Sequence, residues 1–170
     1  MLFRSWIPQA ILITHGHADH TNSVVDLKKA YPDLRVYISM HELVMYKHLD
    51  TEIKEIEDDE SLNFGNLKIK SLHTPGHSPG SQCFLIENNL FSGDTLFIDG
   101  CGNCKKTGAN AQQLYNSLYH RLSILPDETM IYPGHDYSSK PADSLGNQRK
   151  TNPYFQCESA TEFIALRLGL

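Results

Sequence analysis

The chain has 170 residues, of which 40% are hydrophobic and 21% are charged. This length and composition suit a single domain, spanning residues 1–170, with a hydrophobic core of its own. The formal net charge of −5 argues against a surface for nucleic acids or anionic membranes. The chain has no run of about 18 apolar residues, the length that spans a membrane, and its start lacks the cleavage site of a signal peptide. We therefore expect a cytoplasmic protein.

The first third of the chain alternates between strand-like and helix-like patterns. These patterns predict a strand at 10–14, a helix at 22–30, a strand at 35–39 and a helix at 40–49. Thr21 or Asn22 is able to cap the first helix. Residues 52–60 contain six acids and one lysine, which predicts a solvated connection, because the acids lack the spacing of a calcium loop.

Two hairpins and a longer helix are predicted next. The first hairpin covers residues 62–72 and turns at Gly65-Asn66, and the second joins 82–87 to 90–92 through Asn88-Asn89. Residues 111–125 predict a helix whose leucines, at positions 114, 118, 122 and 125, share one face and pack on a sheet. In outline, this is an α/β sandwich.

A cluster of ligand-type side chains directly follows the first predicted strand. Within six positions the chain carries His15, His17, Asp19 and His20. A lone histidine at a strand end is more often a packing or surface residue. Four residues able to bind a metal rarely occur at this spacing by chance, so the segment predicts a metal site.

Three later residues strengthen that prediction. His77, Asp94 and His135 each follow an apolar, strand-like stretch, and each stands beside a glycine. Glycine lets a loop turn sharply where a strand ends, so ligands from separate strands can converge. Ordinary turn residues are the alternative, but the first cluster makes that interpretation weak.

Four motifs carry a resemblance to a known family. They are THGHADHT at 14–21, TPGHSPG at 74–80, SGDTLF at 92–97 and YPGHDY at 132–137. Together they resemble the metallo-β-lactamase-fold hydrolases, in particular their glyoxalase II-like branch, and they run in family order across nearly the whole chain. The resemblance implies the αββα sandwich of that family. Because only fourteen residues precede His15, the N-terminal strands of that sandwich are expected to be missing.

The resemblance also implies a binuclear metal centre. One metal would be held by His15, His17 and His77. The other would be held by Asp19, His20 and His135, and Asp94 would bridge the two. Imidazole and carboxylate ligands suit zinc, and they also serve iron and manganese, so two divalent ions, zinc first among them, are expected.

The implied chemistry is hydrolysis of a thioester. Two cations about 3.5 to 4 Å apart hold a water, lower its pKa and polarise the carbonyl that the resulting hydroxide attacks. Asp19 would orient that water. A thiolate of pKa about 8 to 9 leaves with little help from an acid. The substrate would be an acyl thioester of glutathione, coenzyme A or a carrier protein.

Two relatives in the family compete for the function. Residues 99–104, 108–118 and 132–137 are similar to glyoxalase II-like thioesterases found with polyketide synthases, which act on carrier proteins. Residues 148–153 resemble persulfide dioxygenases, which hold a single iron at the positions of His15, His77 and Asp94. Those enzymes carry an arginine where this chain has Asn103, and the difference favours hydrolysis.

The two ends of the chain qualify the resemblance. Only 35 residues follow His135, fewer than the helical domain with which glyoxalase II holds glutathione. The short start predicts that apolar surface and a sheet edge face water, and both promote self-association. A third alternative is therefore an inactive fragment with a role in assembly, which the seven retained ligands make the weakest of the three.

The remaining cysteines and histidines predict no second site. Cys101 and Cys104 have the spacing of a redox or zinc pair but lack a second pair, so a loop near the active site is favoured. Cys83 is expected to be buried in a strand. The histidines outside the motifs are expected to be surface or packing residues: His41, His48, His73 and His120.

Overall fold

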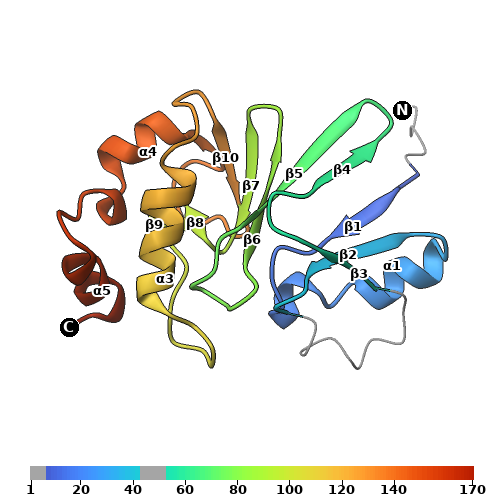
Figure 1. Ribbon diagram of the computed structural model, residues 1–170, viewed down its shortest axis with the longest axis horizontal. Helices are drawn as coiled ribbons and strands as arrows, with labels where there is room; N and C mark the ends of the chain where they lie inside the picture. The colour runs from blue at the N-terminus through green and yellow to red at the C-terminus, as the bar shows by residue number, and fades with distance from the viewer. Residues whose placement is uncertain (1–6, 43–52) are drawn as a thin grey trace.

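The computed structural model describes residues 7–42 and 53–170, which form two sheets with helices outside them (Figure 1). The smaller sheet has the order β1-β2-β3 and consists of β1 (Ala10–Leu12), β2 (Arg35–Ser39) and β3 (Ile53–Ile56). All of its described pairings are parallel. Helix α1 (Val24–Ala30) joins β1 to β2 and covers the outer face of this sheet.

The larger sheet has six strands in the order β11-β10-β7-β6-β5-β4. They are β4 (Ser61–Phe64), β5 (Leu67–His73), β6 (Gln82–Ile86), β7 (Asn89–Gly93), β10 (Met130–Pro133) and β11 (Asp143–Ser144). Strand β10 pairs with β7 in parallel, whereas the other neighbours are antiparallel. A short ribbon of β8 (Leu96–Phe97) and β9 (Gly100–Cys101) follows β7.

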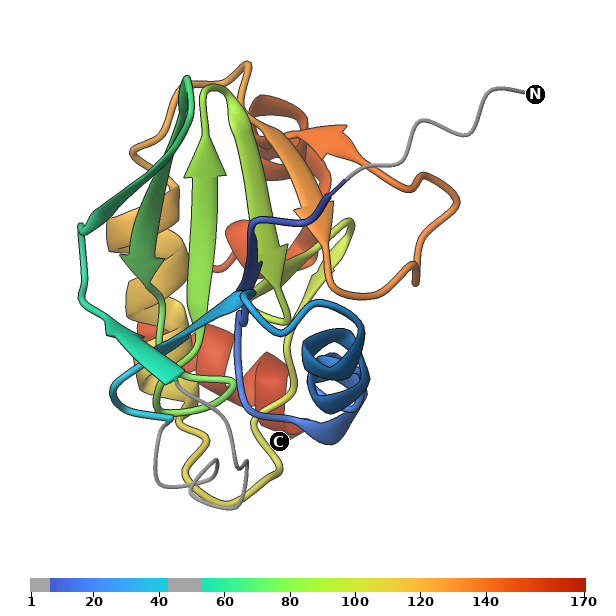
Figure 2. The same ribbon diagram turned by 90° about the vertical axis from the view of Figure 1, so that its right-hand side faces the viewer.

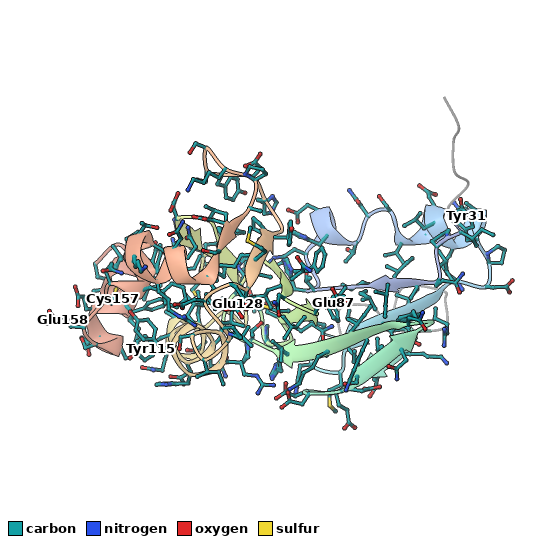
Figure 3. All side chains as sticks on the ribbon, turned by 90° about the horizontal axis from the view of Figure 1, so that it is seen from above. Tyr31, Glu87, Tyr115, Glu128, Cys157 and Glu158 are labelled. Atoms are coloured by element: carbon teal, nitrogen blue, oxygen red, sulfur yellow. The ribbon has the colours of Figure 1, made fainter. Side chains whose placement is uncertain are left out.

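Helices from the second half of the chain cover the outer face of the larger sheet (Figures 1 and 2). They are α3 (Ala111–Asn116), continued by the π-helix Ser117–Leu122, then α4 (Leu145–Thr151), the 3-10 turn Pro153–Phe155 and α5 (Ala160–Leu168). Seen from above, Tyr115 and Cys157 lie in this helical layer at one end, and Tyr31 lies beside α1 at the other (Figure 3). The layers therefore run helix, sheet, sheet, helix.

Alternation along β2 explains how the smaller sheet packs on both faces. Val36 and Ile38 are fully buried and pack with Ile13 and Val24, which lies on α1. Tyr37, between them, points to the other face and belongs to the apolar cluster that joins the two sheets. Successive strand residues face opposite sides, so the side chains of this short strand pack both against α1 and against the larger sheet.

The leucine face predicted for residues 111–125 is confirmed for its first three leucines, but the helix ends at Leu122, and Leu125 lies beyond it and is only partly buried. Leu114, Leu118 and Leu122 are fully buried and belong to the same core cluster as Leu90 and Ile131 of the larger sheet. Burial of each such side chain contributes about 1.5–3 kcal/mol. The helix changes to π geometry at Ser117, a departure that a 3.6-residue period does not reveal.

The hairpin predictions are confirmed, with one shift in a turn. The turn of the first hairpin lies at Gly65-Asn66, because Phe64 pairs with Leu67. The second turn lies at Glu87-Asn88, not at Asn88-Asn89, because Asn89 already pairs with Ile86. Glu87 takes the left-handed conformation, with φ of 54°, that would more often fall to asparagine or glycine.

Two local predictions were wrong. Neither Thr21 nor Asn22 caps α1: the N-cap residue is Ser23, and the Thr21 hydroxyl instead donates to the carbonyl of His17 at 3.1 Å. The acidic segment is not merely a solvated connection, because residues 53–56 form β3, paired with β2. Backbone pairing there outweighs the polarity of the sequence.

Parts of two other predictions fall outside the described residues. The helix expected at 40–49 is described only at 40–42, which form a turn, and His48 also lies outside. No helix in the described part of the chain is long and apolar enough to cross a membrane.

Candidate metal centre

The seven predicted ligands come together at one end of the sandwich. His15 and His17 lie in the loop after β1, and Asp19 and His20 lie in the 3-10 turn Ala18–His20. The others follow strands of the larger sheet: His77 after β5, Asp94 after β7 and His135 after β10. Their side-chain donors form three overlapping groups, each with all donor atoms within 4.8 Å of one another. Two of them are described below, and the third, formed by His15, His20 and Asp94, connects those two. Both sheets therefore contribute to the same cluster.

The first group consists of His15, His17 and His77. Nδ1 of His17 lies 2.9 Å from Nε2 of His77. Oδ2 of Asp94 faces the group, at 3.4 Å from Nε2 of His77 and 4.0 Å from Nε2 of His15. Three imidazoles and a carboxylate oxygen thus surround one small volume.

The second group consists of Asp19, His20 and His135. The Nε2 atoms of His20 and His135 are 3.1 Å apart, and Oδ2 of Asp19 lies 3.6 Å and 3.4 Å from them, respectively. Asp94 also faces this group, with Oδ1 at 3.2 Å from His20 and Oδ2 at 3.4 Å from His135. The Asp94 carboxylate therefore lies between the two groups.

Burial favours the neutral form of histidine, which is the form that binds metals. It lowers the pKa of His15 to about 3 and that of His17 to about 4, and it also lowers the pKa of His77. The hydrogen bond to Asp94 raises the pKa of His20. Neutral imidazoles that converge on a shared carboxylate match the donor chemistry of zinc and iron, so these residues fit two divalent ions.

Two glycines of the motifs are required by close packing. Gly76 has a φ of 138°, and a Cβ there would collide with the backbone of Leu114. A Cβ on Gly134 would lie 2.6 Å from Oδ1 of Asp94 and 2.9 Å from Cε1 of His20. The chain beside His77 and His135 reaches the cluster because these positions lack side chains.

A backbone carbonyl orients one of the imidazoles. Nδ1 of His77 lies 2.7 Å from the carbonyl oxygen of Asn103, to which it donates. This hydrogen bond directs Nε2 toward the cluster, as partners of metal-binding histidines do. The sequence did not identify this contact, because a backbone carbonyl has no residue-type signature.

Glu42 is a buried acid that sequence reasoning missed. Its side chain is 0% exposed, and its Oε1 accepts hydrogen bonds from the Ser78 hydroxyl and, at 2.9 Å, from the Gly80 amide. It lies just after β2 and so ties the loop that carries His77 to the smaller sheet. No local signal distinguishes it from the other acids of the chain.

Gln82 links the sheets beneath the first histidine motif. Its amide side chain donates to the carbonyl of Ile13 at 2.8 Å, and its backbone N–H donates to Thr14 at 2.9 Å. The Ser71 hydroxyl donates to its Oε1 at 2.9 Å. These contacts hold the start of the His15 loop against β6 of the larger sheet.

Cys83 lies where the sequence predicts, whereas Cys101, expected in a loop, lies in a short strand. Cys83 is fully buried in β6, and all four cysteines are free. Cys101 lies in β9, where burial raises the pKa of its thiol to about 12. The Cys104 thiol donates to the carbonyl of Gly76 at 3.5 Å, so its loop contacts the loop that bears His77.

The other described histidines lie outside the cluster. The rings of His41 and His73 stack at 4.8 Å, and His120 packs edge-on against Tyr115. Nε2 of His73 also lies 3.0 Å from the carbonyl oxygen of Pro79.

The sandwich and the site together define a class of protein: an αββα fold with histidine and aspartate ligands gathered at the strand ends. The chain belongs to the metallo-beta-lactamase superfamily, because the sequence model of that family matches residues 7–135.

Two curated relatives share most of this chain. It is 35% identical over 158 residues to the "Probable polyketide biosynthesis zinc-dependent hydrolase BaeB" of Bacillus velezensis, covering 93% of this chain and 70% of that protein. It is 43% identical over 141 residues to the hydroxyacylglutathione hydrolase of Bartonella quintana, covering 82% of this chain and 53% of that protein. The match therefore spans about half the length of the Bartonella enzyme.

Two solved structures are similar over most of this chain. ETHE1 from Myxococcus xanthus superposes with a TM-score of 0.83 at 32% identity, covering 95% of this chain and 70% of that one. The protein TTHA1623 in a di-iron-bound form gives a TM-score of 0.75 at 35% identity, covering 87% and 78%, respectively.

Proposed function

We propose that this chain is a metal-dependent thioesterase of the glyoxalase II type. The observation that carries the proposal is the Asp94 carboxylate, which lies within 3.4 Å of histidine nitrogens from both ligand groups. A carboxylate in that position suits a bridge between two divalent ions. The polyketide hydrolase and hydroxyacylglutathione hydrolase relatives support hydrolysis as the reaction.

The ligand roles follow the two groups. His15, His17 and His77 would hold one ion. Asp19, His20 and His135 would hold the other, and Asp94 would bind both. When bound, two such ions supply an activated water and polarise the carbonyl that it attacks. We propose zinc, which the name of the Bacillus relative states for that protein.

Asp19 is suited to position the attacking water. Its side chain is 59% exposed, so one face remains open beside the cluster. Partial burial raises the pKa of Asp19, but the hydrogen bond from its own backbone and the neighbouring His20 and His135 lower it more. The carboxylate is therefore ionised at neutral pH and accepts a hydrogen bond from water rather than donating one.

The proposed substrate is an acyl thioester of glutathione, coenzyme A or a carrier protein. Its leaving group is a thiolate of pKa about 8 to 9, which departs without an acid to protonate it. The relatives support this class, because one acts in polyketide biosynthesis and the other on hydroxyacylglutathione. All four cysteines are free, which agrees with the cytoplasmic setting that we propose.

Metal analysis and a thioester assay test the proposal on the full chain. The purified protein should contain close to two metal equivalents and hydrolyse S-lactoylglutathione or an acyl-coenzyme A. A chelator should abolish the activity, and zinc should restore it. His135→Ala should lose mainly one metal equivalent, whereas His120→Ala, outside the cluster, should lose none. A metal-loaded protein that hydrolyses none of these thioesters would refute the proposal.

A mononuclear iron persulfide dioxygenase is the second candidate. It is favoured by the positions of His15 and His77, whose Nε2 atoms lie 4.0 Å and 3.4 Å from Oδ2 of Asp94. One tightly held iron that survives His135→Ala, together with oxygen consumption on glutathione persulfide, would select this function. An assembly role without catalysis is the weakest alternative, and any metal-dependent turnover rules it out.

A further inference from the structure

The backbone directly before His77 is held by donors from distant segments of the chain. The first of these donors is Thr95, the residue that follows Asp94. Its hydroxyl donates to the Thr74 carbonyl at 3.4 Å, and the hydroxyl oxygens of the two threonines lie 2.9 Å apart. Both threonines are buried. A pair of buried hydroxyls therefore joins the loops that carry two of the candidate ligands.

The second donor comes from the helical layer. Ser117 begins the π-helical segment and is buried, and its hydroxyl donates to the Pro75 carbonyl at 2.7 Å. The next carbonyl, that of Gly76, accepts from the backbone N–H of Asn110, the N-cap of α3, at 2.8 Å. All three carbonyls of this stretch thus have a donor from elsewhere in the chain, and two of these donors are side-chain hydroxyls.

The π-helical geometry occurs where the helix touches the loop. A Cβ on Gly76 would lie 2.3 Å from the backbone nitrogen of Leu114, so helix and loop are in backbone contact. Ser117 lies in the next turn of the same helix, where the α-helical hydrogen bonding changes to π. Such short π-helical segments are frequent at functional sites. The site here is the loop that carries His77.

Cys83 completes the contacts on the side of the larger sheet. Its sulfur lies 3.3 Å from the hydroxyl oxygen of Thr74, and its thiol donates to the Ser92 carbonyl at 3.5 Å. Burial raises the pKa of this thiol to about 11, so it keeps its proton at neutral pH. The threonine hydroxyls therefore have polar partners in a buried place, and a satisfied network of this kind favours one rigid arrangement.

These contacts act on a different property of His77 than the contact with Asn103 does. The Asn103 carbonyl bonds Nδ1 and so fixes the rotation of the ring. It does not fix the position of the backbone from which the ring extends. A metal ligand must be held within about 0.5 Å of its productive position. The carbonyls of residues 74–76 are the groups through which the fold can set that position.

We propose that Thr95 and Ser117 are positioning residues, which hold His77 where it can bind a metal ion. Thr95 does so by tying the loop to the segment that carries Asp94, and Ser117 does so by tying it to the helical layer. The inference rests on the metal-dependent function proposed above. It adds two residues that bind neither the metal nor the substrate.

Zinc affinity and the visible spectrum of the cobalt-substituted protein test the proposal without any thioester. Thr95→Val keeps the shape of the side chain but removes its hydroxyl, and Ser117→Ala does the same for the second donor. Each should weaken zinc binding at one of the two sites by about tenfold, measured by competition with a chromophoric chelator. Each should also shift the absorption bands of bound cobalt, which depend on ligand geometry. Thr95→Ser keeps the hydroxyl and should retain most of the zinc affinity.

Thr129→Val and Ser123→Ala are the matched controls. Thr129 is also buried, but it precedes β10, whereas His135 follows that strand. The Ser123 hydroxyl donates to the Tyr119 carbonyl inside its own helical segment. Either control can lower the melting temperature, but neither should change the zinc affinity or the cobalt spectrum. If Thr95→Val and Ser117→Ala lose only stability, as the controls do, the inference is overturned.

The thioester assay separates this inference from the proposed function. At saturating zinc, both test variants should lower kcat and leave KM unchanged, because their hydroxyls bond the ligand loop and not the substrate. If the wild type binds two metals but hydrolyses no thioester, the zinc and cobalt results still decide the inference. An active wild type whose zinc affinity, spectrum and kcat both variants reproduce would refute the inference and leave the proposed function standing. A wild type that binds no metal would refute both.

Discussion

At the scale of single residues, the cluster depends on positions that have no room for a side chain. A Cβ on Gly134 would lie 2.6 Å from Oδ1 of Asp94 and 2.9 Å from the ring of His20. We expect Gly134→Ala to displace this carboxylate or this ring, to lower the metal content below two equivalents and to abolish thioester hydrolysis. Metal analysis and a thioester assay measure these effects, and circular dichroism of the same sample shows whether the variant is folded.

Gly65→Ala is the control for that substitution. Gly65 has a φ of 60° in a hairpin turn, and a Cβ there meets no atom within 4 Å. Alanine in this conformation costs about 1–2 kcal/mol of stability. The variant should therefore melt earlier but keep its metals. If Gly134→Ala behaves in the same way, the close approach to Asp94 has no functional role.

The buried acid Glu42 gives a second prediction at this scale. Glu42→Ala removes the acceptor of the Ser78 hydroxyl and the Gly80 amide, and each buried donor left unpaired costs about 1–3 kcal/mol. The neighbouring His77 should then lose its fixed position. We expect weaker zinc binding, measured by competition with a chromophoric chelator, and a lower melting temperature.

Glu42→Gln separates geometry from charge. Glutamine keeps one carbonyl oxygen that can accept both hydrogen bonds, so its zinc affinity should fall less than that of Glu42→Ala. Equal zinc affinity in the wild type and in Glu42→Ala would show that Glu42 does not position His77.

At the scale of elements, the helix over the larger sheet shows which apolar residues of a helical pattern stabilise the fold. Leu118 lies in its π-helical part and is fully buried, whereas Ile124, just beyond its end, is 73% exposed. Leu118→Ala should lower the free energy of unfolding by about 2–5 kcal/mol. Ile124→Ala should change it by about 0.5 kcal/mol or less. Denaturant titration of both variants checks the contrast, which similar losses would contradict.

At the scale of the whole molecule, the ligand groups connect the two sheets. His15 and His20 lie in the segment after β1 of the smaller sheet, whereas His77 and His135 follow strands of the larger one. Metals bound at these groups would link the layers and stabilise only the folded chain. At about 1,000 times the dissociation constant the gain is about 4 kcal/mol, which for a chain of this size raises the melting temperature by roughly 8–16 °C.

Calorimetry of the metal-free and zinc-loaded protein measures that difference. Asp94→Asn should reduce the gain on adding zinc, because the amide is a poorer bridging ligand than the carboxylate. Bound zinc that leaves the melting temperature unchanged would show that the ions do not link the sheets.

Much of the secondary structure and of the ligand set could be predicted from the amino-acid sequence, because these features depend on neighbours along the chain. Period-two and helical patterns predicted strands such as β2 and the buried leucine face that contains Leu114. The candidate ligands were recognisable because donor side chains stand beside glycines at strand ends. Where local signals compete, prediction failed: Ser23 begins α1 in place of Thr21 or Asn22, and Glu87 occupies a turn position that favours asparagine.

The residues that support the site from distant parts of the chain could not be predicted, because long-range packing brings them together. Glu42 meets Ser78 across 36 positions, and the Asn103 carbonyl meets His77 across 26. Arg167 donates to the carbonyl of Cys101, 66 positions earlier, only because α5 folds back over that strand. Such contacts follow from the packing of two sheets and their helices, which fixes positions in space without leaving any periodic trace in the sequence.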